Sequence, residues 1–158
     1  MKKLLMTMAL VASMVSTSAM AAYVGADVGT QHLNGSAVDS AGVHVGANVN
    51  TNLALELGLS QTQTGNGAKD MTTSLDAVGI LPVGGDTDLL GTVGVESQSV
   101  TATGANDTKI GPTLGLGAQY HVSDAISVRA LVKYEDVNLP TINSDHDVKS
   151  TIGINVAF

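Results

Sequence analysis

The sequence contains no cysteine and no tryptophan, and it has only three tyrosines and one phenylalanine among 158 residues. Without cysteine no disulfide can hold the fold together, so an exported chain needs another means of closure. Charged residues make up 13% of the chain, whereas a soluble domain carries about 25%. Beyond the N-terminal segment, no apolar run reaches the roughly 20 residues of a transmembrane helix. A disulfide scaffold and a helical membrane protein are therefore excluded, and an ordinary soluble domain is disfavoured.

Basic residues are also scarce. Seven Lys and Arg face 14 Asp and Glu, which gives a formal net charge of −7. Two of the seven, Lys2 and Lys3, lie at the extreme N-terminus. A chain without a basic patch cannot displace counterions from phosphates, so nucleic acid is not expected as a partner.

The N-terminal segment has the parts of a secretory signal peptide. Lys2 and Lys3 form a positive region, residues 4–15 are mostly apolar, and Ala19-Met20-Ala21 matches the small-x-small pattern before a cleavage site. The apolar part is too short to span a membrane as a helix. We predict a cleaved signal peptide over residues 1–21, with cleavage after Ala22 as the neighbouring option. A single barrel domain is then expected over residues 22–158.

The rest of the chain is dominated by a period of two. In the segment 53–60, LALELGLS, leucine occupies every odd position while Ala, Glu, Gly and Ser occupy the even ones. Successive side chains of a strand point to opposite faces, so this segment has one leucine face and one small or polar face. The alternation recurs near 23–30, 43–49, 75–83, 89–96, 114–122, 126–134 and 151–158, although Val78 and Ile80 share the face of Asp76 in the third of these. We therefore predict an all-β domain of eight antiparallel strands.

The connections between these segments alternate in length. Short turns are expected at 50–52, 84–88 and 123–125, in residue types that favour turns. Longer polar segments are expected at 31–41, 60–73, 97–109 and 136–148. Short turns at one end and long loops at the other are typical of an up-and-down transmembrane β-barrel with the short turns in the periplasm.

The apolar face could look outward into lipid or inward into a dry core. An inward apolar face would describe a soluble periplasmic barrel. An outward one leaves the polar face to fill a narrow lumen, which eight strands make just wide enough for side chains. The export signal and the barrel layout favour the second arrangement, so we expect the protein in the cell outer membrane. The predicted inward polar positions are Asp27, His44, Asn48, Glu56, Asp76, Glu96, Gln119, Arg129, Lys133 and Asn155.

Several segments resemble the OmpA-like family of small outer-membrane barrels. The opening strand YVGADVG at 23–29 is similar to that family's first strand, and 111–134 is the closest stretch, with Pro112, Gly117 and Tyr120 ahead of a short turn and Arg129 after it. The resemblance covers essentially residues 22–158. It implies an eight-stranded transmembrane barrel with a lumen network in which an inward arginine meets inward acids.

Carried over by position, that resemblance makes Arg129 and Glu56 members of the network. The chain departs from the family's pattern at Gln119, where an acid is expected, and at Asp27, where a base is expected. The network must therefore be wired differently, with Lys133 or Lys149 as further cations. The candidate lumen polar network comprises Asp27, His44, Glu56, Asp76, Glu96, Arg129 and Lys133.

The resemblance also bears on assembly and anchoring. The terminal strand ends in Phe158, similar to the C-terminal aromatic by which the barrel assembly machinery recognises its clients. Such barrels usually carry aromatic girdles at both membrane interfaces. Here only Tyr120, Tyr134 and Phe158 are in outward register, so a sparse girdle is expected.

The four histidines and the many acids invite a catalytic or metal-binding interpretation. The segment Ser144-Asp145-His146-Asp147 could offer oxygen and imidazole ligands to a cation, but such short polar runs are common in solvated loops. His44 with Asp27 or Asp76 could serve a lipid-modifying enzyme, yet polar lumen packing explains the same residues. We therefore predict no catalytic residue, no cofactor and no metal site.

Three functions remain open. The leading hypothesis is a structural or surface-interaction barrel, of the adhesion or colonisation type, that meets a host or cell-surface ligand through its four long polar segments. The alternative is a narrow channel for water, ions or small solutes, gated by lumen charges. A lipid-modifying enzyme is the third. In each case outer-membrane lipid and lipopolysaccharide are expected as surroundings.

Overall fold

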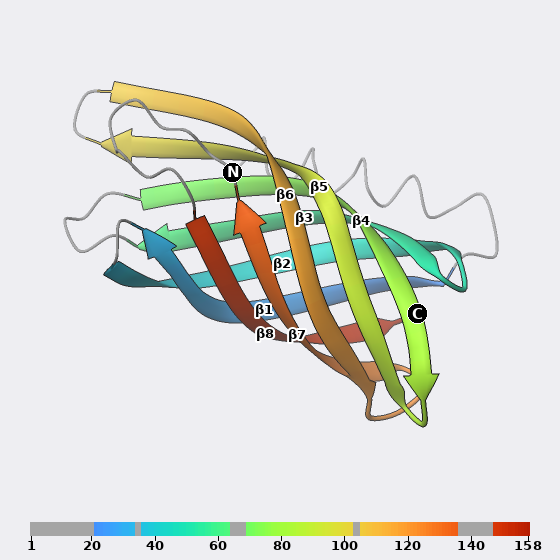
Figure 1. The fold of residues 1–158 in the computed structure, drawn as a ribbon. Coiled ribbons are helices and arrows are strands. Elements are labelled where there is room, and N and C mark those ends of the chain that lie inside the picture. The colour runs from blue at the N-terminus through green and yellow to red at the C-terminus, as the bar shows by residue number, and fades with distance from the viewer. Residues whose placement is uncertain (1–20, 34–35, 64–68, 103–104, 136–146) are drawn as a thin grey trace.

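The computed structural model describes residues 21–33, 36–63, 69–102, 105–135 and 147–158. Most of the predicted signal peptide, residues 1–20, lies outside these ranges. The described residues form eight strands: β1 (Ala22–Leu33), β2 (Ser36–Asn50), β3 (Leu53–Gln63), β4 (Lys69–Gly84), β5 (Thr87–Ala102), β6 (Ala105–His121), β7 (Ile126–Glu135) and β8 (Asp147–Ala157). Each strand pairs with the next, and β8 pairs with β1, so the sheet closes into an antiparallel barrel (Figure 1). Among the described residues no helix is long and apolar enough to cross a membrane.

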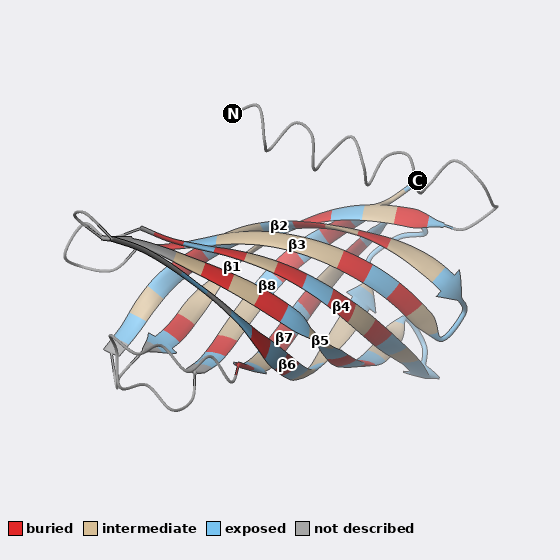
Figure 2. Ribbon diagram, turned by 90° about the horizontal axis from the view of Figure 1, so that it is seen from above, coloured by how far each residue is buried: buried red, intermediate tan, exposed pale blue. Residues whose placement is uncertain are grey.

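The period of two determines which side chains face the lumen, as predicted. Along each strand buried residues alternate with more exposed ones (Figure 2). In β3, for example, Ala54 and Glu56 are buried while Leu55 between them is exposed. Large apolar side chains dominate the exposed positions, whereas the buried positions are mostly polar. The apolar face therefore points outward, and the alternative of a soluble barrel with an apolar interior is wrong.

The predicted boundaries of the long polar segments are wrong in three of four cases. Strands occupy most of 31–41, 60–73 and 97–109, and the strand pairing continues to the pairs Leu33 with Ser36 and Ala102 with Ala105. Of 136–148, residues 136–146 lie outside the described ranges, and Asp147 and Val148 belong to β8. The physical reason is that Ser, Thr and Gln in these segments continue the same ladder of backbone hydrogen bonds. Loss of apolar alternation marks where the lipid-facing surface ends, not where the strand ends.

The blurred pattern in β4 has a structural explanation. Val78 is buried and packs in the lumen against Ala54 and Leu90, with Tyr23 and Ile80 beside them. This apolar cluster lies toward the end of the barrel that carries the short turns. At that end, β4 runs into a tight turn in which Gly84 and Gly85 have φ of 111° and 61°, a conformation that residues with a Cβ rarely adopt.

Candidate functional site: the barrel lumen

The strand register brings the predicted polar residues to one interior. Glu56 of β3 lies opposite Asp76 of β4, and Arg129 of β7 lies opposite Gln119 of β6. Glycines on the inner face make room for the larger side chains. At Gly46, an added Cβ would lie only 2.2 Å from the Tyr23 ring, so the tyrosine side chain fills the space that this glycine leaves.

Arg129 is at the centre of the polar interior. Its Nη1 lies 2.5 Å from Glu56 Oε1, and both side chains are almost fully buried. The Tyr23 hydroxyl donates to the same Oε1 at 2.5 Å. Glu56 thus accepts one charged and one neutral hydrogen bond, a combination that offsets the cost of burying its charge.

His44 extends this centre across the lumen. One ring nitrogen, Nδ1, lies 3.1 Å from Asp27 Oδ2, while Nε2 lies 2.8 Å from Asn155 Oδ1. Arg129 Nη2 is 3.1 Å from His44 Nε2, so the Arg129–Glu56 pair and the His44–Asp27 pair are in contact. Asn155 in turn donates to Gln119 Oε1 at 3.1 Å.

A second ion pair involves Lys133, which lies farther along β7 from the short turns than Arg129 does. Lys133 Nζ is 2.5 Å from Asp76 Oδ2, and the Thr113 hydroxyl donates to Asp76 Oδ1 at 3.1 Å. Lys149 is also buried, and its Nζ donates to Ser60 Oγ at 2.6 Å. Six of the seven predicted network residues are therefore joined in three pairs. The seventh, Glu96, is buried but takes part in none of these pairs.

Two cavities meet at the Arg129–Glu56 pair. One, of about 280 Å³, opens toward the short turns and is bordered by Tyr23, Asp88 and His121 among others. The other, of about 50 Å³, lies in mid-lumen and is bordered by Lys133 and Glu96. Arg129 and Glu56 border both cavities. The lumen is therefore an interrupted passage, with a buried ion pair between its two parts.

Several lumen residues were not part of the predicted network, among them Tyr23, Asp88, His121 and Glu135. Tyr23 is in the same register as Asp27, so alternation alone could have placed it inward. His121 lies on the inner face that alternation predicts for 114–122, and its Nε2 is 2.7 Å from Asp88 Oδ2 near the short turns. The pair was not predicted because Asp88 falls in the predicted turn 84–88. Glu135, which accepts from Gln31 Nε2 at 3.4 Å, is the last residue of β7. It was not predicted because it falls between the predicted strand 126–134 and the predicted polar segment 136–148.

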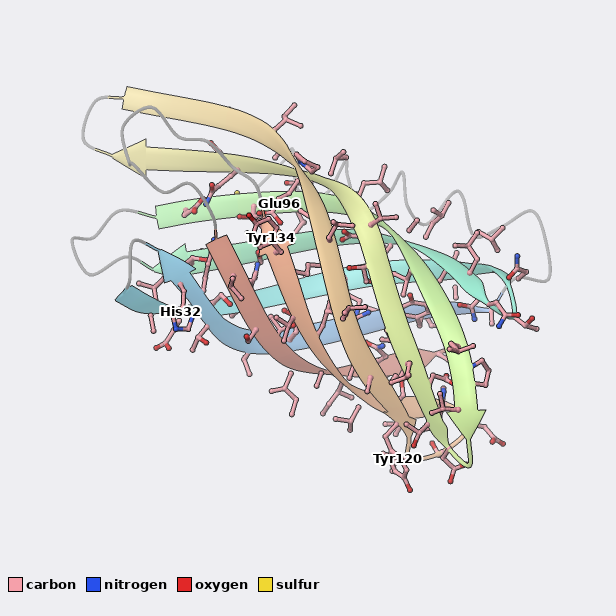
Figure 3. The ribbon with its side chains drawn as sticks, viewed as in Figure 1. His32, Glu96, Tyr120 and Tyr134 are labelled. Atoms are coloured by element: carbon pink, nitrogen blue, oxygen red, sulfur yellow. The ribbon has the colours of Figure 1, made fainter. Side chains whose placement is uncertain are left out.

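The outward aromatic residues are the three predicted ones. Tyr120, Tyr134 and Phe158 are 52%, 41% and 74% exposed, and Figure 3 shows Tyr120 and Tyr134 at opposite ends of the barrel. Phe158 follows β8, and its backbone N–H donates to Ala22 O at 2.9 Å across the seam with β1. His32 is exposed on the outer side of β1. In the described part of the chain, no group of three or more His, Asp or Glu residues is arranged to hold a metal ion.

A closed eight-stranded barrel with an apolar outer surface and a polar, ion-paired lumen defines the class of transmembrane outer-membrane barrels. The chain belongs to the family of outer membrane protein beta-barrel domains, whose pattern it matches over residues 4–158. Its place is accordingly the outer membrane. Comparison with curated protein sequences gives no significant match.

Solved structures share this fold. Neisserial surface protein A matches with a TM-score of 0.66 and 15% identity, over 89% of this chain and 98% of its own. The N-terminal barrel domain of Pseudomonas aeruginosa OprF matches with a TM-score of 0.68 and 15% identity, over 86% and 97%. Ail, the attachment invasion locus protein of Yersinia pestis, matches with a TM-score of 0.58 and 13% identity, over 88% and 97%. At such identities the similarity concerns the fold.

Proposed function

We propose that this barrel is a surface-interaction protein that presents the extended hairpin of β5 and β6 outside the membrane. The supporting observation is the unequal length of the strands. β4, β5 and β6 have 16, 16 and 17 residues, whereas β7 and β8 have 10 and 11. A tilted strand needs about 9–11 residues to cross the bilayer, so β5 and β6 are longer than a crossing requires.

The outward side chains show at which end the excess lies. On β5 the outward residues change from Val93 and Val95 to Ser97 and Ser99, at the end away from the short turns. On β6 the outward Thr108 precedes Ile110, which is 76% exposed. At about 3.3 Å per residue, five or more extra residues project the hairpin roughly 15–20 Å beyond the apolar surface. Figure 1 shows β5 and β6 continuing side by side in this direction.

The chemistry of the hairpin favours a neutral ligand rather than a polyanion. Ail has been solved in complex with the heparin analogue sucrose octasulfate, a multiply charged anion. The present chain carries a net charge of −7, which repels such a ligand at long range. The described outward residues of the hairpin are hydroxyl side chains, which suit hydrogen bonding to a neutral glycan or to peptide groups on a host or cell surface.

A hairpin-shortening variant tests the proposal. Ser99 pairs with Thr108, so residues 100–107 can be replaced by an Asn-Gly turn without changing the register below. We expect cells expressing this variant to lose adherence to a host-cell or glycan surface while the barrel still inserts. The control is the same operation on β1 and β2, where His32 pairs with Ala37 and residues 33–36 can be replaced by Asn-Gly. Equal adherence of wild type and the β5–β6 variant would contradict the proposal.

A narrow channel is the second candidate, supported by the two cavities that meet at Arg129 and Glu56. Moving that one ion pair would join them into a passage for water or ions. Arg129→Gln should then change single-channel conductance in planar bilayers, and Asp88→Asn, a change outside the pair, should alter it much less. Absence of conductance in both wild type and Arg129→Gln would rule the channel out.

The remaining partners are proposals of the same kind. We propose that Phe158 at the β1–β8 seam serves recognition by the barrel assembly machinery, and that the outer surface contacts membrane lipid and lipopolysaccharide. We assign no catalytic role to His44, because its ring nitrogens are engaged by Asp27 and Asn155 inside the lumen. Unchanged lipid composition in cells that carry His44→Ala is the expected result, and a changed composition would favour the enzyme.

A further inference from the structure

The larger of the two lumen cavities has a closed end and an open end. The buried ion pair of Arg129 and Glu56 lies at the closed end, and Thr51, Asp124 and Ala125 of the short turns lie at the open end. The volume of about 280 Å³ is close to the lower limit of small-molecule pockets, which run from roughly 300 to 1,000 Å³. The cavity is therefore of a size for a small organic molecule that enters from the side of the short turns.

One wall of this cavity is apolar, although most buried positions of the barrel are polar. Val78 and Ile80 of β4 and Leu90 of β5 border the cavity. Val78 and Leu90 belong to the buried apolar cluster, and Ile80 packs against it. Water held in a cavity needs about two to four polar partners, and aliphatic side chains supply none. This wall therefore suits the apolar body of a ligand better than it suits water.

The other side of the lining is polar. Gln119 and His121 of β6, Ser127 of β7 and Asn155 of β8 border the same cavity. In the closed strand order, β4 and β5 lie on one side of the barrel and β8 lies on the other, so the apolar and the polar side chains face each other across the cavity. Small-molecule sites combine apolar walls with a few polar groups that orient the ligand. A ligand with one apolar part and one polar part matches both walls.

The charges of the lining favour a cation over an anion. Glu56 and Arg129 neutralise each other across 2.5 Å. The lining also contains the carboxylates of Asp88 and Asp124. Asp88 Oδ2 contacts His121 Nε2 at 2.7 Å, but an unperturbed imidazole is mainly uncharged at neutral pH and does not cancel a carboxylate charge as a guanidinium does. The open end of the cavity therefore has an excess of negative charge, which attracts cations and repels anions.

We propose that this cavity binds a small amphipathic ammonium compound, such as an alkylamine, whose apolar body lies on the β4–β5 wall and whose cationic group pairs with Asp88. Asp88 and Leu90 are two positions apart in β5, so both point inward and lie about 7 Å apart along the strand, a distance that a short alkylammonium spans. An anionic ligand would need a cation to pair with, whereas Arg129 in the lining is already paired with Glu56. The site lies at the end of the barrel opposite the tip of the β5–β6 hairpin, so this binding is separate from the surface interaction proposed above.

Backbone amide shifts of the refolded full chain test the site. The ¹⁵N-labelled protein in a zwitterionic detergent at neutral pH is titrated with butylammonium chloride. Butanol and sodium pentanoate, which carry the same butyl group on a neutral or an anionic head, are titrated in parallel. We expect butylammonium to cause saturable shifts in the amides of β4, β5 and β6 near the short turns. Butanol and pentanoate should bind about fivefold more weakly or less tightly still, because they form no ion pair with Asp88.

A substitution at Asp88 distinguishes the site from unspecific attraction to an acidic protein. Asp88→Asn removes the charge and keeps a hydrogen-bonding oxygen for His121, so the variant should fold, and its affinity for butylammonium should fall by about fivefold. Asp86→Asn is the matched control. Asp86 lies in the turn before β5, exposed and outside the lining of the cavity, so this variant should bind as wild type does although its net charge changes equally.

Three results would each overturn the proposal. The first is the absence of saturable shifts with butylammonium. The second is binding of butanol or pentanoate as tight as that of butylammonium, which would show that the cationic head is not recognised. The third is an unchanged affinity for butylammonium in Asp88→Asn, because the ammonium group would then not pair with that carboxylate.

Discussion

At the scale of single residues, the lumen contains buried ion pairs in which removing one charged partner costs more stability than replacing both. Arg129 and Glu56 are 73 positions apart in the chain and come together only because the barrel closes. Deleting one partner of a buried pair leaves the other charge without compensation, which is costlier than replacing both by neutral groups. The stability of the barrel should therefore respond to these residues in a non-additive way.

Arg129→Met is predicted to lower the free energy of unfolding by about 3–5 kcal/mol, because Glu56 is left buried and charged. The double variant Arg129→Met/Glu56→Gln should recover most of that loss. Denaturant unfolding of wild type, Arg129→Met, Glu56→Gln and the double variant in detergent micelles measures the coupling free energy between the two side chains. Additive costs would show that the two side chains do not interact as the structure has them.

Two glycines with opposite surroundings give a second prediction. Gly46→Ala should destabilise the barrel by about 1–3 kcal/mol, because its methyl group would collide with Tyr23 and force a well-packed ring to move. Gly91 faces outward with no atom within 4 Å of an added Cβ, so Gly91→Ala should stabilise by roughly 0.5–1 kcal/mol. Thermal unfolding of both variants measures the two effects. An equal change in stability for Gly46→Ala and Gly91→Ala would contradict the prediction.

Alternation predicted which residues enter the lumen but not which of them pair. Asp27, His44 and Arg129 follow from the period of two, because an inward position is a property of one strand. A contact across the lumen depends on the stagger of all eight strands and cannot be read from local sequence. Asp70, which is also buried, was not predicted for a different reason: it lies in the polar part of β4 within 60–73, where the sequence predicts a loop.

At the scale of elements, the strands and the apolar surface are separate features. Apolar alternation shows where a strand contacts lipid, and backbone pairing continues beyond it in β2, β4, β5 and β6. The sequence predicted the number and order of the strands because each crossing needs its own alternating segment. It predicted these strands too short at the end away from the short turns, because Ser, Thr and Gln serve equally well in a strand above the membrane and in a loop.

The lipid-facing surface can be tested on one strand and one turn. Val93→Arg, in the apolar part of β5, should cost about 2–4 kcal/mol, because a charge near the bilayer midplane is strongly unfavourable. Val122→Arg, just beyond β6 beside the turn that precedes β7, should cost at most about 1 kcal/mol. Both valines are comparably exposed, at 57% and 60%, so exposure alone predicts no difference. Folding titrations into lipid vesicles measure the two costs, and equal values would mean that Val93 does not contact lipid.

At the scale of the whole molecule, closure replaces the stabilising devices that the sequence lacks. With no disulfide and a mostly polar interior whose apolar cluster lies toward one end, the barrel is held by a continuous ladder of backbone hydrogen bonds and by paired lumen charges. Its outward aromatic residues are confined to β6, β7 and the end of β8. The girdle is therefore one-sided as well as sparse, so contact of strands with acyl chains carries more of the anchoring than interfacial aromatics do.

The most direct test of this account is the electrophoretic mobility of the boiled and unboiled protein, taken from outer-membrane and soluble periplasmic fractions of cells expressing the full chain. A closed barrel with its hydrogen bonds paired all round resists detergent until heated, so the account predicts a heat-dependent mobility shift in the outer-membrane fraction. An unshifted band confined to the soluble periplasmic fraction would contradict it, because the apolar face would then have to be covered by the protein itself.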